Sequence, residues 1–299
     1  MISKVLSAPA FLTLALLMLP AGGGYAQVKA GPGEGQQQMA DFSLSGFADK
    51  GKKNWDLTGK QADIASDVIK LNDIESNFYG DQEDMKLTAD RGDFDRLKGS
   101  LHLQDDVVVT TTSGARLTTD SLDWDRKQQM VTTPDIVNIV KDEVTINGLG
   151  ASANTGLNKV NLEKDVKVDI DNVSTAVKDK KEKVEITCDG PLEVDYQKNL
   201  AVFRNNVKVQ TWDGLIESDS MDVYFYSSDK PEGKGKTRDP SAAELNGSKI
   251  DRILAHGNVK ITRGQDVSLS QEAVYSAQDH KITLTGRPKL VIYTSTAPN

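Results

Sequence analysis

The sequence has little cysteine, few aromatic residues and no excess of positive charge. Cys188 is the only cysteine among 299 residues, so no disulfide can form within the chain. Aromatic residues make up 6% of the sequence, which predicts a modest core rather than a thick globular one. The net charge of −8 disfavours nucleic acid as a partner, because binding it requires Lys and Arg to neutralise phosphates.

Patterns that carry catalysis or bind metals are also lacking. The histidines, His102, His256 and His280, are far apart in sequence and lack the spacing of metal ligands. Paired acids such as Asp105 and Asp106 lack the glycine spacing of a calcium-binding loop, and aspartate favours turns. We therefore expect no cofactor, no bound metal and no enzymatic activity.

The longest hydrophobic run lies at the N-terminus. Lys4 supplies a positive charge, residues 10–19 are almost entirely apolar, and small residues lead up to Ala26. This order is typical of a secretory signal peptide spanning residues 1–26. Residues 5–26 carry no charge and are long enough to cross a membrane, so retention of this segment as an anchor stays open.

From residue 41 onward, apolar residues alternate with polar ones at a period of two. This alternation predicts an all-β fold of short strands, each with one buried face. Residues 60–74 are the one ambiguous segment. Their apolar spacing partly suits a helix and equally suits two strands joined near Ser66 and Asp67.

A short phrase recurs along the predicted strands. It appears as Asp106-Val-Val-Val, Asp165-Val-Lys-Val, Asn206-Val-Lys-Val and Asn258-Val-Lys-Ile, with a weaker copy at Asp135-Ile-Val-Asn-Ile. Recurrence of one strand unit indicates that short strands stack along one direction, and that each unit buries its apolar face against its neighbours. The open ends of such a stack would expose unpaired backbone groups, which can recruit another chain.

Two ordered series of motifs carry a family resemblance. The first series includes Phe42-x-Leu44-x-Gly46-Phe47, Leu101-x-Leu103-x-x-Asp106-Val107 and Leu117-Thr-Thr-Asp120-x-Leu122-x-Trp124-Asp125. The second includes His256-Gly257-Asn258-Val259 and Ala273-Val-Tyr275, followed by Ile282-x-Leu284-x-Gly286. The first series resembles the periplasmic domain of the LptC family, and the second resembles the LptA (OstA-like) repeat of lipopolysaccharide transport.

The resemblance and the composition together divide the chain. After the signal peptide or anchor at residues 1–26, we expect a flexible glycine- and glutamine-rich linker at 27–40. Residues 41–180 resemble an LptC β-jellyroll, and residues 181–299 resemble LptA-like β repeats that continue it. Residues 227–248, rich in Gly, Pro, Lys and Asp, are expected to form an exposed loop.

The resemblance implies an elongated β-jellyroll of V-shaped cross-section with an apolar groove between its sheets. It implies a periplasmic protein, free or tethered to the inner membrane, that bridges the inner and outer membranes by end-to-end strand pairing. The implied partners are lipopolysaccharide, an inner-membrane ABC transporter complex, an LptA-like bridge and an outer-membrane LptD-like receiver, with end-to-end self-association as a further expectation.

Alternating aliphatic residues are the candidate lipid contacts, because alternate residues of a strand share one face and a jellyroll directs that face inward. An inward aliphatic residue can equally be simple core, and both interpretations stay open for each position. The candidates are Val107, Val109, Leu117, Leu122, Trp124, Val144, Ile146, Val166, Val168, Val207, Val209, Val223, Val259 and Ile261.

Two other functions stay open at this point. A structural β-scaffold of the cell envelope would assemble through its strand edges and bind no lipid. An extracytoplasmic enzyme acting on polysaccharide would need a concentrated carboxylate site, for which Asp105 and Asp106 are the candidates.

Overall fold

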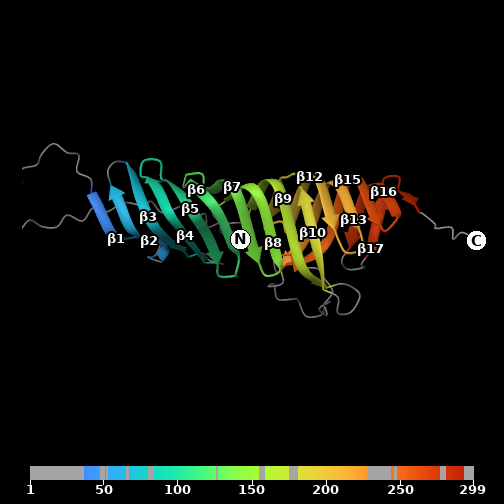
Figure 1. Ribbon diagram of the computed structural model, residues 1–299, viewed down its shortest axis with the longest axis horizontal. Coiled ribbons are helices and arrows are strands. Elements are labelled where there is room, and N and C mark those ends of the chain that lie inside the picture. Colours follow the sequence, from blue (N-terminus) through green and yellow to red (C-terminus); the bar gives the residue numbers. More distant parts are fainter. Residues whose placement is uncertain are drawn as a thin grey trace, which may run out of the picture. The chain divides into compact units, whose positions relative to one another are not determined.

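The computed structural model describes residues 37–47, 51, 53–64, 67–79, 84–125, 127–154, 159–174, 181–227, 244–245, 248–276 and 281–292 (Figure 1). Within these ranges the chain consists of antiparallel β-strands and their connections, which confirms the predicted all-β fold. None of the described segments is a helix with the length and hydrophobicity needed to cross a membrane. The predicted signal peptide and most of the predicted loop at 227–248 lie outside the described residues.

The chain divides into two compact units between Ser113 and Gly114. In unit 1, which precedes this point, each strand pairs antiparallel with the next along the chain. Its strands are β1 (Gln37–Phe47), β2 (Lys53–Ile64), β3 (Val68–Phe78), β4 (Met85–Asp95) and β5 (Ser100–Thr111).

Unit 2 begins at Gly114 and is also built by antiparallel pairing of strands that are near in sequence. β9 and β12 each pair with both β10 and β11, β15 pairs with β13, β14 and β16, and β16 pairs with both β17 and β18. The strands are β6 (Arg116–Asp125), β7 (Met130–Lys141), β8 (Val144–Asn154), β9 (Lys159–Ser174), β10 (Lys181–Cys188), β11 (Leu192–Asp195), β12 (Leu200–Gln210), β13 (Leu215–Ser227), β14 (Glu244–Leu245), β15 (Ser248–Arg263), β16 (Asp266–Ser276), β17 (Lys281–Thr285) and β18 (Lys289–Val291).

The ambiguous segment at residues 60–74 forms strands rather than a helix. It comprises the end of β2 and the start of β3, and Ile64 lies directly opposite Ile69 across the hairpin. The strand-pair interpretation is therefore confirmed, and the helical one is wrong. Pairing with neighbouring strands decides the conformation where the apolar spacing alone cannot.

The predicted end of the linker differs from the structure. β1 begins at Gln37, so the last residues of the predicted linker at 27–40 are strand. They pair with β2, which satisfies their backbone groups. The two compact units divide after Ser113, which is a different division from that between the expected LptC-like and LptA-like parts at 180/181; strand pairing of β9 with β10 and β11 continues across 180/181.

The recurring Asp/Asn-Val phrase marks a corner within the strand. Its first residue has a positive φ in all four strong copies: Asp106 (47°), Asp165 (50°), Asn206 (55°) and Asn258 (47°). Asp and Asn tolerate this left-handed conformation better than most other residues with a side chain. At the corners of β5, β12 and β15 the strand register also shifts. We call this position the corner of each strand.

Buried residues flank each corner on both sides. The valine directly after the corner is at most 1% exposed in Val107, Val166, Val207 and Val259. The residue three positions before the corner is at most 3% exposed in Leu103, Leu162, Phe203 and Ala255. In unit 2, residues from both sides of the corners belong to one core cluster, so both halves of each strand pack onto a shared interior.

The weaker copy of the phrase, at Asp135, is not a corner. Asp135 has no positive φ, and the side chain of Ile136 is 67% exposed rather than buried. Val137 is fully buried in its place. An aspartate before an aliphatic residue therefore does not by itself impose the left-handed backbone.

Buried hydroxyl groups satisfy backbone carbonyls close to the corners. The Ser218 Oγ donates to the carbonyl of Ser220 at 3.1 Å, and the Ser270 Oγ donates to the carbonyl of Glu272 at 2.9 Å. Ser218 and Ser270 are 6% and 7% exposed. Because the register shift removes some ladder hydrogen bonds here, these hydroxyls supply partners that the neighbouring strand does not.

The left-handed corner should be sensitive to the type of residue that occupies it. We expect Asp165→Val to lower the free energy of unfolding by about 1–2 kcal/mol, because a β-branched residue is strained at positive φ. Asp165→Gly removes the same exposed carboxylate without that strain and serves as the matched control. Urea unfolding followed by circular dichroism measures both; equal losses in the two variants would contradict the strain explanation.

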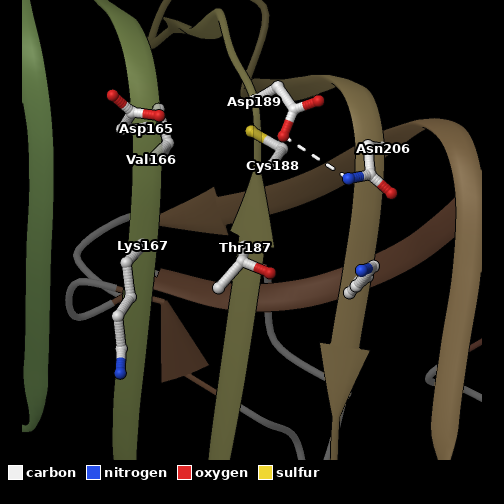
Figure 2. Close-up of a pocket in the computed structure, with 8 residues that line it drawn as sticks. Asp165, Val166, Lys167, Thr187, Cys188, Asp189 and Asn206 are labelled. Atoms are coloured by element: carbon white, nitrogen blue, oxygen red, sulfur yellow. Dashed lines mark hydrogen bonds between the residues drawn. The ribbon is translucent and has the colours of Figure 1, made fainter.

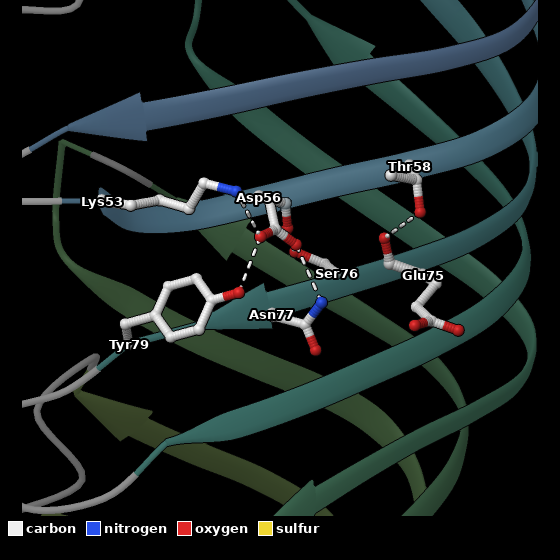
Figure 3. Close-up of polar contacts among 7 residues, drawn as sticks. All are labelled: Lys53, Asp56, Thr58, Glu75, Ser76, Asn77 and Tyr79. Atoms are coloured by element: carbon white, nitrogen blue, oxygen red, sulfur yellow. Dashed lines mark hydrogen bonds and ion pairs between the residues drawn. The ribbon is translucent and has the colours of Figure 1, made fainter.

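A polar cluster on unit 1 links the neighbouring strands β2 and β3 (Figure 3). The carboxylate of Asp56 accepts hydrogen bonds from Asn77 Nδ2 at 2.8 Å, from the hydroxyl of Tyr79 at 2.8 Å and from Lys53 Nζ at 3.0 Å. The Ser76 Oγ donates to the backbone carbonyl of Asp56 at 2.8 Å. These hydrogen bonds, that from Asn77 above all, lower the pKa of Asp56 to about 2.

The lowered pKa of Asp56 predicts a pH-dependent contribution to stability. A carboxylate whose pKa falls on folding stabilises the protein above its unfolded value, near 3.8, and loses this effect as the pH falls toward about 2. Asp56→Asn should therefore destabilise the protein at pH 7. The difference in free energy of unfolding between this variant and the wild type should shrink between pH 4 and pH 2. Urea unfolding across this pH range measures that difference. A difference independent of pH would contradict the stabilising role of the Asp56 carboxylate.

Candidate functional site

A continuous row of aliphatic side chains crosses unit 2 on one side of the corners. Each member lies directly opposite the next in the strand pairing, so all of them project from the same face of the sheet. From β6 to β15 the first row consists of Leu117, Ile139, Ile146, Val168, Ile186, Val209, Ile216 and Ile261. Ser268 on β16 and Leu290 on β18 continue it.

A second row crosses unit 2 on the other side of the corners, with β11 and β17 in place of β10 and β18. Its members are again direct cross-strand partners, and it includes aromatic side chains at or near both ends. It consists of Trp124, Val131, Ala153, Val160, Val194, Ala201, Val223, Ile253, Tyr275 and Ile282. Each row therefore offers an unbroken, mainly apolar strip that runs perpendicular to the strands.

The rows contain both buried and accessible positions. In the first row Val168 is 1% exposed, whereas Ile146 and Ile261 are only partly buried. In the second row Val223 is 2% exposed, whereas Ile253 is partly buried. These residues pack onto the same core cluster, so the two rows border one apolar interior within unit 2.

The predicted lining residues of unit 2 fall on these rows or next to them. Leu117, Ile146, Val168, Val209 and Ile261 lie on the first row, and Trp124 and Val223 lie on the second. Val144, Val166, Val207 and Val259 belong to the core cluster that both rows border, and Leu122 on β6 is 6% exposed.

The other two predicted residues, Val107 and Val109, lie on β5 in unit 1. Val109 belongs to a separate row there, formed by Leu44, Leu57, Ser76, Leu87 and Val109. Val107 follows the corner of β5 and is fully buried. Unit 1 thus has a mainly apolar strip of its own, interrupted by Ser76 and built by the same cross-strand pairing.

Sequence reasoning missed several of the most deeply buried residues of unit 2. Leu162, Leu192, Phe203 and Met221 are all at most 2% exposed, yet none was among the candidates. In Leu200-Ala-Val-Phe203 every residue is apolar, so alternation cannot identify the inward face. For Leu162 and Phe203 a usable signal was present, because each stands three positions before an Asp/Asn corner.

Apolar members of the rows reach strands with free edges. Among the described residues, β17 and β18 each pair with β16 alone, and β1 pairs with β2 alone. Leu290 on β18 and Ile292, the residue after that strand, are 62% and 61% exposed, and Phe47 on β1 is 58% exposed. An edge of this kind leaves backbone N–H and C=O groups able to pair with a further strand.

The outer surface at the corners is polar and shows no catalytic arrangement in the described part of the chain. A shallow depression there is bordered by Asp165, Lys167, Thr187, Asp189, Asn206 and Lys208 (Figure 2). Burial raises the pKa of the Cys188 thiol, which disfavours the reactive thiolate. Among the described residues no three His, Cys, Asp or Glu side chains gather in a way that could hold a metal ion.

The predicted catalytic pair does not form a site of its own. Asp105 and Asp106 both occupy the left-handed corner of β5, and the side chain of Asp105 is paired with Arg91 on β4. That pairing lowers the pKa of Asp105, so this carboxyl group stays ionised. Both residues thus have a structural explanation, as the preference of aspartate for turns predicts.

Comparisons with known proteins match both parts of the chain. The LptC family model, described as lipopolysaccharide-assembly, LptC-related, matches residues 10–171. The model described as LptA/(LptD N-terminal domain) LPS transport protein matches residues 185–297. No curated protein matches the chain.

A solved structure similar to the chain is LptH from Pseudomonas aeruginosa, described as the LptA homologous periplasmic component of the conserved lipopolysaccharide transport device. The identity is 12% and the TM-score is 0.31, over 61% of this chain and 96% of that one.

The family matches agree with the resemblance carried by the motifs. The LptC-related model alone covers more than half of the chain, and the LptA-like model begins shortly after it ends. Proteins of these families are transport proteins of the periplasm rather than enzymes. The chain therefore belongs to the LptC-related family of lipopolysaccharide assembly and is a component of lipopolysaccharide transport.

Proposed function

We propose that this chain holds the acyl chains of lipopolysaccharide against the apolar rows of unit 2 and forwards them as part of a bridge between the inner and outer membranes. The observation that supports this most is the first row, which is aliphatic at every strand that it crosses from Leu117 on β6 to Ile261 on β15. Paired strands lie about 4.8 Å apart, so the row offers an equivalent contact at each short step.

The free energy of transferring an acyl chain from a membrane into water explains why a carrier needs an apolar surface. Each buried methylene contributes about 0.8 kcal/mol, so a chain of about a dozen carbons resists transfer into water by roughly 10 kcal/mol. A carrier must replace the contacts that the membrane provided. Because neighbouring members of the row are Leu, Ile or Val, a shift by one strand exchanges one aliphatic contact for another, and the net change in free energy per step is small.

Entry of lipid requires the strand halves to move apart. The centre of unit 2 is filled by its own side chains, since Val166, Phe203 and Val207 are at most 1% exposed. The partly buried members Ile146, Ile216 and Ile253 border this centre and are accessible first. Acyl chains would contact these positions and then separate the two halves of the strands, replacing contacts between protein side chains with contacts to lipid.

The free strand edges supply the means of assembly. An edge strand can accept a strand of a partner through backbone hydrogen bonds, which needs no particular side chains. β18 combines such an edge with the exposed side chain of Leu290 on the first row. We propose that an LptA-like or LptD-like chain, or a second copy of this one, pairs there, and that the edge of β1 serves the inner-membrane ABC transporter complex.

The segment at 1–26 either directs export or retains the chain at the inner membrane.

Neighbouring residues on one strand provide a direct test of lipid contact. A photoreactive amino acid in place of Ile146 should crosslink to lipopolysaccharide, because Ile146 is on the first row and partly buried. The same amino acid in place of Thr145 projects from the opposite face of β8 and should not crosslink. Ile261 and Lys260 on β15 form a second matched pair. Mass spectrometry of the crosslinked chain reads out each position, and equal labelling of both faces would rule out binding along the row.

The filled core also supports one alternative, a structural β-scaffold of the envelope. Val166 and Phe203 pack as they would in an ordinary sandwich that binds nothing. A scaffold would associate through its edges but carry no lipid. Native mass spectrometry after purification without detergent separates the two functions, since only a carrier would retain lipopolysaccharide.

The proposed pairing at β18 predicts a matched pair of charge substitutions. Leu290→Asp should weaken association at this edge by roughly tenfold or more, because burying a leucine contributes about 1.5–3 kcal/mol and the introduced charge opposes burial. Lys289→Asp changes the adjacent residue, which projects from the other face, and should have a smaller effect. Analytical ultracentrifugation measures self-association, and binding to an immobilised LptA-like chain measures the mixed interaction. An unchanged dissociation constant for Leu290→Asp would exclude this edge.

A further inference from the structure

The two family ranges adjoin within a single run of paired strands. The LptC-related range ends at residue 171, in β9, and the LptA-like range begins at residue 185, in β10. β9 pairs with β10 over one half of its length and with β11 over the other. We call this pairing of β9 with β10 and β11 the seam between the LptC-like and LptA-like parts.

The inner face of the seam is apolar and closely packed. Val168 lies opposite Ile186, Leu162 opposite Leu192, and Val160 opposite Val194. Leu162, Val168 and Leu192 are at most 2% exposed, and Ile186 is 7% exposed. The pairs at Val168 and Val160 are members of the first and second rows, so both rows cross the seam without a polar interruption.

The outer face of the seam is held by ion pairs. Lys167 Nζ lies 2.7 Å from Glu185 Oε2, and Lys183 Nζ lies 3.0 Å from Asp169 Oδ1, so each pair joins β9 to β10. Lys159 Nζ lies 3.7 Å from Asp195 Oδ2 and joins β9 to β11. These ion pairs are partly exposed, so they contribute modestly to stability and mainly fix the register of the seam.

Backbone hydrogen bonds continue across the corner of the seam. The amide of Asp165 donates to the carbonyl of Asp189 at 3.2 Å, and the amide of Asp189 donates to the carbonyl of Asn205 at 2.9 Å. Figure 2 shows this region, including the bond from Asn206 Nδ2 to Asp189 Oδ1. Gly190 is required here, because a Cβ at this residue would lie 2.3 Å from the carbonyl oxygen of Glu163. Side chains and backbone are therefore closely packed across the seam.

We propose that lipid passes from the LptC-like part to the LptA-like part inside this one chain, across the seam, with no transfer between subunits at that point. The inference rests on the proposed function, since it requires that the rows bind acyl chains. Transfer between separate chains would need two free edges to meet before lipid could move. Here the edges are permanently paired, and the step from Val168 to Ile186 spans adjacent strands about 4.8 Å apart.

The order of the transfer reaction distinguishes this route from exchange between chains. Full-length protein carries a photoreactive amino acid either at Ile146, in the LptC-like part, or at Ile261, in the LptA-like part. Lipopolysaccharide is loaded at less than one molecule per chain, free lipid is removed, and samples are irradiated at intervals at protein concentrations that differ a hundredfold. Because the rows offer near-equivalent contacts, labelling at Ile146 and Ile261 should relax toward a constant ratio with one rate constant that is independent of concentration.

Other outcomes of the concentration series separate the two proposals. A rate constant that rises in proportion to protein concentration would show transfer between chains and would overturn the intramolecular route, while leaving lipid binding intact. An absence of labelling at both positions would overturn the proposed function itself. This series needs no substitution in the seam, so it does not depend on how well a seam variant folds.

A substitution on the seam gives an independent test. Ile186→Asp places a charge on the first row at the seam and should slow the appearance of label at Ile261 at least tenfold, while label at Ile146 persists. Thr187→Asp adds the same charge to the neighbouring residue, whose side chain projects from the outer face, and should leave the rate within about twofold of the unsubstituted chain. Circular dichroism confirms that both variants fold. Equal rates in the two folded variants would contradict passage along the first row.

Discussion

The architecture depends on one backbone constraint, the left-handed residue at the corner of a strand. A regular strand alternates its side chains between two faces, and nothing in that alternation gathers both halves of one strand around a shared interior. At Asp165 and Asn206 the positive φ changes the direction of the backbone, and apolar residues on both sides of the corner become buried. The same device recurs in β9, β12 and β15, and residues from both sides of these corners join the single core of unit 2 without a thick layer of aromatic side chains.

Repetition of this corner places equivalent residues opposite one another. Because each strand pairs with the next in a fixed register, Ile146, Val168 and Ile186 line up across the sheet, and the same holds on the other side of the corners for Val160, Val194 and Ala201. A core assembled in this way also offers a continuous apolar surface along which an acyl chain could move. Its contacts repeat from strand to strand, which suits a long flexible apolar ligand better than a compact one that needs a single deep pocket.

Much of the fold could be predicted from the sequence, because a period of two survives in the strand halves that follow each corner. That is why Val166, Val168 and Val207 were identified as inward residues. The halves that precede the corners were missed where apolar residues follow one another, as at Phe203. The repeat was recognised as a phrase, but Ile136 shows that the phrase alone does not specify a corner, since the backbone at Asp135 is not left-handed.

Other features could not be predicted from the sequence for a different reason. The choice between helix and hairpin at residues 60–74 depends on pairing with β1 and β4, and the division after Ser113 reflects how densely strands contact one another over the whole chain. Neither is a local property. The seam between the LptC-like and LptA-like parts was placed near 180/181 by the motifs, but the sequence did not show that strand pairing continues through it.

The central claim, that acyl chains lie along the first row, is tested most directly by NMR of isoleucine methyl groups in the presence of lipopolysaccharide that carries a nitroxide on an acyl chain. The account predicts strong broadening of the methyl signals of Ile146, Ile216 and Ile261, while the exposed Ile136 on β7 remains sharp. Broadening of Ile136 as strong as that of the row, or no broadening of any isoleucine at saturating lipid, would contradict it.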